Sequence, residues 1–204
     1  MERMNAILNF WFENISDETH IDKNKMPFKK WFMKDKNFDA QIKKEFEPDL
    51  GLVKSGGYKM WEKSSRGRLA LIILCDQLSR NMYRDSSRMF ETDPLALELS
   101  LRSVNDRSDE ELRLIERVFL YMPFQHAEDL KIQEISLKVF SELVQEVRIK
   151  NPGNVSYYEY TLQFAKRHFD IIKRFNRFPH RNKILGRAST LEEQEFLKNP
   201  GSGF

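Results

Sequence analysis

The first segment of the sequence that could do chemistry is DQLSRNMYR, where polar residues directly continue an apolar run. Asp76 and Arg80 are four residues apart, and Gln77 lies three before Arg80 and seven before Arg84. This spacing places the side chains on one face of a helix. One carboxylate beside two guanidiniums fits a ligand site, but it equally fits an internal salt bridge that organises helix ends. The sequence leaves both interpretations open.

A second segment, MPFQHAEDLKIQE, places His126 and Glu128 in a turn and Gln133 in the helix that follows. An imidazole titrates near neutral pH, so His126 could act as a general acid or base. The alternative is a histidine that only bonds a helix terminus. His126 and Glu128 are two residues apart and have no cysteine partner, which is not a zinc-binding pattern. We expect no metal site and no cofactor.

The third segment, HFDIIKRFNRFPHRNKILGR, is strongly basic. Its candidate ligand-binding residues are His168, Arg177, His180, Arg181, Asn182 and Arg187. From Lys166 to Arg187 eight basic residues face one acid, whereas the whole chain carries a net charge of +3. Guanidiniums suit bidentate binding of phosphate or carboxylate, and the interleaved Phe175, Phe178, Ile184 and Leu185 predict that the loop is buried. The alternative is a basic loop neutralised by Asp76, Glu128 and other acids of the chain.

Composition excludes several classes of protein. The aromatic residues near the basic segment recur at core spacing, so we do not expect nucleic acid as a partner. The apolar run Leu69 to Cys75 is the longest and falls far short of the roughly 20 residues that span a bilayer. Cys75 is the sole cysteine and is interpreted as a packing residue. Without an intramolecular disulfide or a signal-peptide cleavage pattern, we expect a cytoplasmic protein.

The elements that must position these residues are predicted to be helices, because apolar residues recur at three and four rather than at two. A chain of 204 residues, 40% hydrophobic, suits a single all-α domain over 1–198, with a flexible tail over 199–204. Proline is expected to open a helix at Pro27, to end one at Pro48 and to turn the chain at Pro123. Capping boxes are predicted at Ser108 with Glu111 and at Thr190 with Glu193. The remaining predicted helices cover 4–13, 64–84, 92 onward, 130–147 and 157–175, the last closed by Asn176 in the left-handed region.

Four segments in this order resemble the bacterial family known as domain of unknown function 924. They are ILNFWFE, LALIILCDQLSRNMYRDSSRMFETD, FLYMPFQHAEDLKIQE and RFNRFPHRNKILGRASTLEEQEFL, and together they reach from about Ile7 to Leu197. The resemblance implies a tetratricopeptide-like stack of antiparallel helix pairs, and it carries over no catalytic residue. The chain departs from the family pattern at Asn176, where glycine is usual, and at Ala127.

Together the three segments predict one pocket or groove for a small anionic ligand, such as a phosphorylated one. An enzyme would use His126 or His180 as acid or base, with Asp76 or Glu128 orienting it. Alternatively, the chain is a protein- or peptide-binding module in which the polar clusters are purely structural. A solvent-connected cavity faced by the histidines and arginines would favour a ligand site. The sequence does not give the ligand, the reaction or the oligomeric state.

Overall fold

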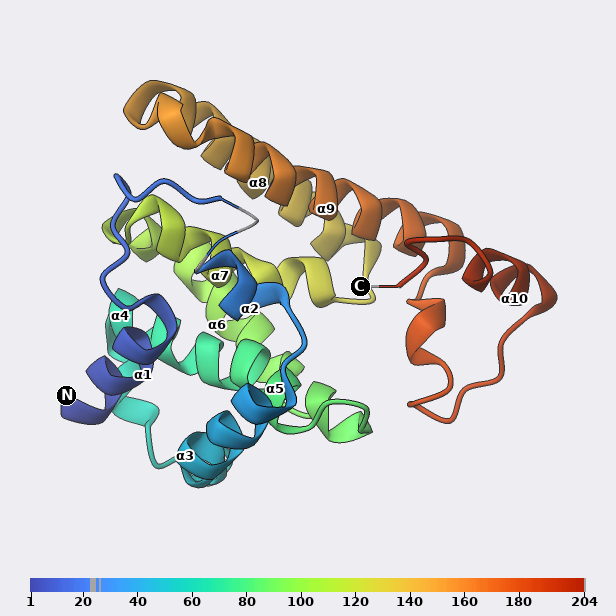
Figure 1. The fold of residues 1–204 in the computed structure, drawn as a ribbon, viewed down its shortest axis with the longest axis horizontal. Helices are drawn as coiled ribbons and strands as arrows, with labels where there is room; N and C mark the ends of the chain where they lie inside the picture. The colour runs from blue at the N-terminus through green and yellow to red at the C-terminus, as the bar shows by residue number, and fades with distance from the viewer. Residues whose placement is uncertain (23–24, 26, 204) are drawn as a thin grey trace.

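The computed structural model describes residues 1–22, 25 and 27–203. Within these residues every regular element is a helix, and together the helices form a single compact domain, as predicted (Figure 1). The tetratricopeptide-like stacking of helix pairs stays a prediction. No described helix is both long enough and apolar enough to cross a membrane.

The centre of the domain is a long helical segment over residues 65–82. It consists of α4 (Ser65–Ile72), a wider π-helical turn (Ile73–Leu78) and α5 (Ser79–Met82). Residues 69–78 are buried, which agrees with the prediction that this apolar run lies in the core. Around it pack α1 (Glu2–Phe12), α3 (Lys36–Lys54), α6 (Asp93–Asn105) and α7 (Leu114–His126).

Two long helices, α8 (Leu130–Lys150) and α9 (Val155–Phe175), pack side by side and cover α7 (Figure 1). Helix α9 ends at Asn176 in the left-handed conformation, with φ of 55°, as predicted. The loop that follows leads to α10 (Leu191–Leu197). There the predicted capping box is confirmed, because Thr190 Oγ1 accepts from Glu193 N–H and the Glu193 carboxylate accepts from Thr190 N–H.

Three predicted boundaries were wrong. Pro48 lies inside α3 and Pro123 inside α7, and the chain turns only after His126. A proline removes one backbone donor, and here the buried side chains on either side, such as Phe46 and Leu50 in α3, keep the helix continuous. At Ser108 only a short 3₁₀ turn forms; the true helix starts at Leu114, where the Glu116 carboxylate accepts from Arg113 N–H.

The short helix α2 (Phe28–Phe32) begins directly after Pro27, as predicted. Trp31 anchors it, since the indole Nε1 donates to the Trp11 carbonyl at 3.0 Å and the ring lies 4.8 Å from that of Phe119. At the other end of the chain, Arg167 donates to the Gly201 carbonyl at 2.8 Å, so residues 199–203 lie back against α9. The flexibility predicted for 199–204 stays a prediction.

Candidate functional site

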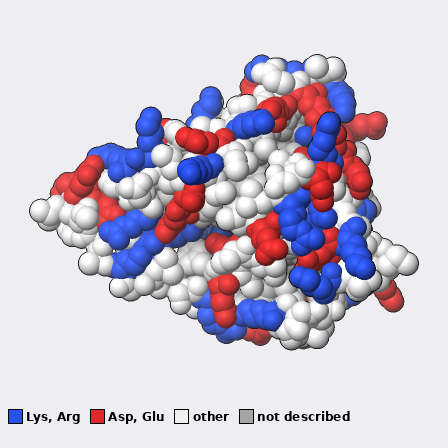
Figure 2. Space-filling view, turned by 180° about the vertical axis from the view of Figure 1, so that it is seen from behind, with Lys and Arg blue, Asp and Glu red and all other residues white. Residues whose placement is uncertain are grey.

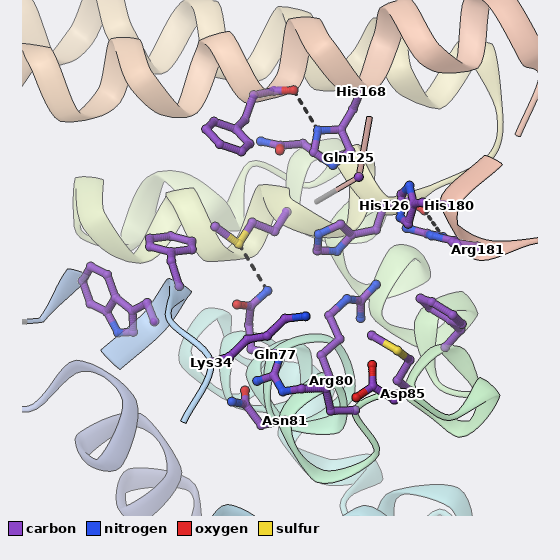
Figure 3. A pocket seen from close by; sticks show the side chains of 18 of the residues that line it. Lys34, Gln77, Arg80, Asn81, Asp85, Gln125, His126, His168, His180 and Arg181 are labelled. Atoms are coloured by element: carbon purple, nitrogen blue, oxygen red, sulfur yellow. Dashed lines mark hydrogen bonds between the residues drawn. The ribbon is translucent and has the colours of Figure 1, made fainter. Parts of the chain in front are cut away.

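A cavity of about 1080 Å³ lies between α2, the π turn with α5, the end of α7, α9 and the loop after Asn176 (Figure 3). It brings together seven of the predicted site residues from all three segments. These are Gln77, Arg80, Arg84, His126, His168 and His180 with its neighbour Arg181, and Asp76 lies directly behind them.

The π turn at Ile73–Leu78 shapes the floor of this cavity. Ser79 N–H reaches back five residues to the Leu74 carbonyl, so neighbouring carbonyls lose their usual backbone donors. Side chains replace those donors: Ser79 Oγ donates to the Cys75 carbonyl at 2.6 Å and Arg80 Nη1 to the Asp76 carbonyl at 2.7 Å. Thr92 Oγ1 also donates to the Cys75 carbonyl, at 2.7 Å. Such turns occur frequently at functional sites, and helical periodicity in the sequence gives no sign of one.

Asp76 is fully buried and makes three polar contacts. Its carboxylate lies 2.7 Å from His126 Nδ1 and 3.1 Å from Arg80 Nη1, and it accepts from Gln77 Nε2 at 2.5 Å. Burial alone would raise the pKa of this carboxyl, but Arg80 and His126 hold that pKa well below its usual range. The predicted pairing of Asp76 with Arg80 is confirmed, and the carboxylate is ionised at neutral pH.

The bond to Asp76 fixes the tautomer of His126. An ionised carboxylate can only accept, so Nδ1 carries the proton and donates it to the bond. Burial and the nearby Arg80 lower the pKa of His126, which keeps the imidazole neutral at pH 7. Nε2 then holds a free lone pair, and no described residue donates to it. His126 lines the cavity, so this lone pair is available to a bound molecule.

Arg80 and Arg84 also line the cavity, but both guanidiniums already have carboxylate partners. Arg80 binds Asp93 through two hydrogen bonds of 2.9 Å in addition to its contact with Asp76. Arg84 binds Asp39 at 2.6 and 2.9 Å. The salt-bridge interpretation of the first segment therefore holds for Arg80 with Asp76, whereas Arg84 pairs with Asp39 of α3 and not with Asp76.

Arg181 differs from the other arginines of the site. It is only 7% exposed, yet no carboxylate of the described residues lies within 4 Å of its guanidinium, and its buried Nε has no hydrogen-bond partner there. Nη1 donates to the His126 carbonyl at 3.0 Å, and the group lies 4.4 Å from the ring centroid of Phe178 and 4.7 Å from that of Phe90. Burial, with Arg80 nearby, lowers the pKa of Arg181 to about 10, so it remains a cation at neutral pH.

His168 and His180 complete the polar wall of the cavity (Figure 3). His168 Nδ1 lies 2.7 Å from the Phe164 carbonyl, and its ring centroid lies 6.1 Å from that of His126. Burial, with His126 nearby, holds the pKa of His168 well below its ordinary value. Burial and the adjacent Arg181 lower the pKa of His180 to about 4. Three neutral imidazoles therefore surround the Arg181 cation at pH 7.

Four other predicted site residues do not line the cavity. Arg177 binds Glu193 at 2.6 and 2.7 Å, and Arg187 binds Glu128 at 2.5 and 2.9 Å. Glu128 also accepts from Phe178 N–H at 2.8 Å, and Asn182 donates to Ser189 Oγ at 3.0 Å. The pairs with Glu193 and Glu128 neutralise two of the loop's arginines, Arg177 and Arg187, with acids of the chain itself. They hold the loop that carries His180 and Arg181.

Sequence analysis missed much of the cavity lining. Lys34, Lys183 and the amide of Gln125 line it, and the Gln125 side chain makes no hydrogen bond to a described residue. An aromatic wall, formed by Phe28, Trp31, Phe32, Tyr160 and Phe164, lines it as well. In the described part of the chain, no three His, Cys, Asp or Glu side chains are grouped in a way that could hold a metal ion.

Residues 7–201 match the family described as bacterial protein of unknown function (DUF924). The chain belongs to the DUF924 family. A solved structure of a protein of unknown function, ATU0120 from Agrobacterium tumefaciens, is similar to it with a TM-score of 0.79 and 32% identity over 97% of each chain. A search of curated proteins found no match. The family match confirms the resemblance, and the similar solved structure agrees with the fold described above.

Proposed function

We propose that the cavity binds a small anionic ligand, such as a phosphate ester or a carboxylate, through Arg181. The observation that carries this proposal is a buried guanidinium at a cavity wall with no carboxylate partner among the described residues. Removing a cation from water costs several kcal/mol, roughly, unless negative charge or hydrogen bonds replace the lost solvation. A ligand oxyanion in the cavity would supply both.

The surrounding charges support this assignment. Among the cavity-lining residues five are basic and one, Asp85, is acidic. Arg80 and Arg84 are paired with carboxylates, which leaves Arg181 and the exposed Lys34 and Lys183 at the rim. On the face shown in Figure 2, basic and acidic side chains are interspersed rather than gathered by sign. Nucleic-acid binding uses a continuous basic surface, so we propose a small ligand instead. A cytoplasmic location stays a prediction from the single cysteine.

Phosphate or sulfate should raise the melting temperature more than chloride does at equal ionic strength. A ligand at a hundred times its Kd adds about 2.7 kcal/mol to the free energy of unfolding. For a chain of this size that corresponds to a shift of about 5 to 11 °C. Arg181→Gln should remove the difference between the anions, as measured by differential scanning fluorimetry.

The matched control for this experiment is Arg177→Gln, which changes the same residue type in the same loop. Arg177 is bound to Glu193 and does not line the cavity, so this variant should keep the anion response even if its own melting temperature falls. If the two variants respond alike, or if wild type shows no preference for phosphate or sulfate, Arg181 is a structural residue and the proposal is wrong.

A second candidate function is acid–base catalysis on the same ligand, favoured by the Asp76–His126 pair. Neutral His126 would take a proton at Nε2 from a hydroxyl, a water or an acidic carbon of the bound anion, whose electron pair stays on the oxygen or carbon. The imidazolium that forms would be stabilised by Asp76 at 2.7 Å, and Arg80 and Arg181 would stabilise developing negative charge.

Proton transfer can be detected without knowledge of the product. Candidate phosphate esters and carboxylates incubated with the protein in D₂O should lose the proton signal of an exchangeable carbon, or release alcohol, in NMR spectra. His126→Asn should slow that change by about 10²- to 10⁴-fold, the usual contribution of a positioned acid or base. If anions bind but wild type and His126→Asn give identical spectra over time, the site only binds its ligand.

A further inference from the structure

We infer that the ligand carries a flat apolar body next to its anionic group, and that this body packs on the aromatic wall defined above. The inference rests on the proposed function, because the anionic group is placed at Arg181. It adds the chemical class of the remaining part of the ligand: an aryl or similarly flat apolar group within reach of an acidic one.

The aromatic wall is continuous and spans two helices. The ring of Phe28 lies 4.7 Å from that of Phe32 and 5.7 Å from that of Tyr160. Tyr160 in turn lies 4.8 Å from Phe164, one turn farther along α9. Rings at these separations form an extended surface, and aromatic side chains favour another flat group stacked or edge-on against them.

Phe32 is the least enclosed member of the wall. It is 41% exposed, although the helix that carries it is fixed by Trp31 against Trp11 and Phe119. The Phe32 ring is therefore fixed at the cavity but not covered by protein. A ligand that covers it would bury apolar surface, which stabilises a complex.

The part of the aromatic wall on α2 and the Arg181 cation lie on different sides of the cavity. Helix α2, light blue in Figure 3, closes the cavity on the side opposite His180 and Arg181. An inorganic anion would occupy a small part of about 1080 Å³, a volume in the range of sites for much larger organic ligands. A ligand with its acidic group at Arg181 and a flat apolar body directed towards α2 would contact both sides of the cavity.

The test compares inorganic phosphate with 1-naphthyl phosphate by isothermal titration calorimetry on the full chain. We expect 1-naphthyl phosphate to bind about tenfold more tightly or better, because the naphthyl group adds aromatic contacts to the same anionic group. Phe32→Ala should weaken binding of 1-naphthyl phosphate about three- to tenfold and leave that of phosphate unchanged.

The control Phe169→Ala removes a half-buried phenylalanine of α9 that does not line the cavity, and it should change neither affinity. Equal affinities of wild type for the two probes, with phosphate binding still lost in Arg181→Gln, would overturn the apolar body and leave the anion site intact. Binding of neither probe would overturn the proposed function and this inference together. The comparison on wild type decides the matter even if Phe32→Ala is poorly folded.

Discussion

Replacing Asp76 by alanine is expected to lower the free energy of unfolding by about 3 to 5 kcal/mol, because it leaves buried charge without its partner. The carboxylate is fully buried and is the acceptor for His126, Gln77 and, in part, Arg80. Its loss also leaves the protonated Nδ1 of His126 without an acceptor. In a thermal melt followed by circular dichroism the shift should be about 6 to 20 °C.

The matched control is Glu110→Ala. Glu110 also pairs with an arginine, Arg107, at 2.9 Å, but both side chains are more than half exposed. Surface ion pairs contribute about 0 to 1 kcal/mol, so this variant should melt close to wild type. Similar losses for Asp76→Ala and Glu110→Ala would contradict the assignment of Asp76 as the organising charge of the site.

The second large effect expected is a loss of stability on mild acidification. His126, His168 and His180 all have pKa values below their ordinary range in the folded chain, because burial disfavours the charged imidazole. The unfolded chain binds protons first as pH falls below about 6.5, so stability is complete above that value and declines towards the folded pKa values. Each histidine contributes a slope of up to about 1.4 kcal/mol per pH unit.

Urea unfolding at pH 7.5, 6.5, 5.5 and 5.0 should therefore show the free energy of unfolding decreasing by up to about 5 kcal/mol between pH 6.5 and 5.0. Asp76, whose pKa is lowered in the folded chain, adds a further loss only below about pH 4. His168→Asn should reduce the slope, whereas His20→Asn, at an exposed position, should not. A flat profile over this range would mean that the histidines take up protons equally in the folded and the unfolded chain, and it would contradict the lowered pKa values.

The sequence predicted correctly those helix ends whose hydrogen bonds are made by residues close by in the chain. The Thr190 capping box and the left-handed Asn176 are satisfied by their own neighbours, and both are confirmed. Pro48 and Pro123 were interpreted as helix ends for a local reason, and that interpretation failed because packing on both sides of each proline outweighs one missing donor.

In the candidate site, too, contacts between residues close in the sequence were predictable and contacts between distant residues were not. The pairing of Asp76 with Arg80 depends on helical spacing and was predictable, whereas the partner of Arg177 is Glu193, sixteen residues away across a loop that no periodic pattern describes. Arg177 and Arg181 therefore looked equivalent in the sequence. Only tertiary contacts separate the neutralised arginine from the one left at the cavity wall.

The π turn has a further consequence for the helical segment over 65–82. An added residue in a turn rotates everything after it by about 100° relative to what precedes it. The helix before the turn and the helix after it therefore differ in rotation about the common axis. Up to Ile72 the side chains pack in the core, and from Ser79 onward one face lines the cavity. Asp76 lies within the turn between these two parts. A chain shortened by one residue within 73–75 would retain an apolar helix and would no longer aim Asp76 at His126.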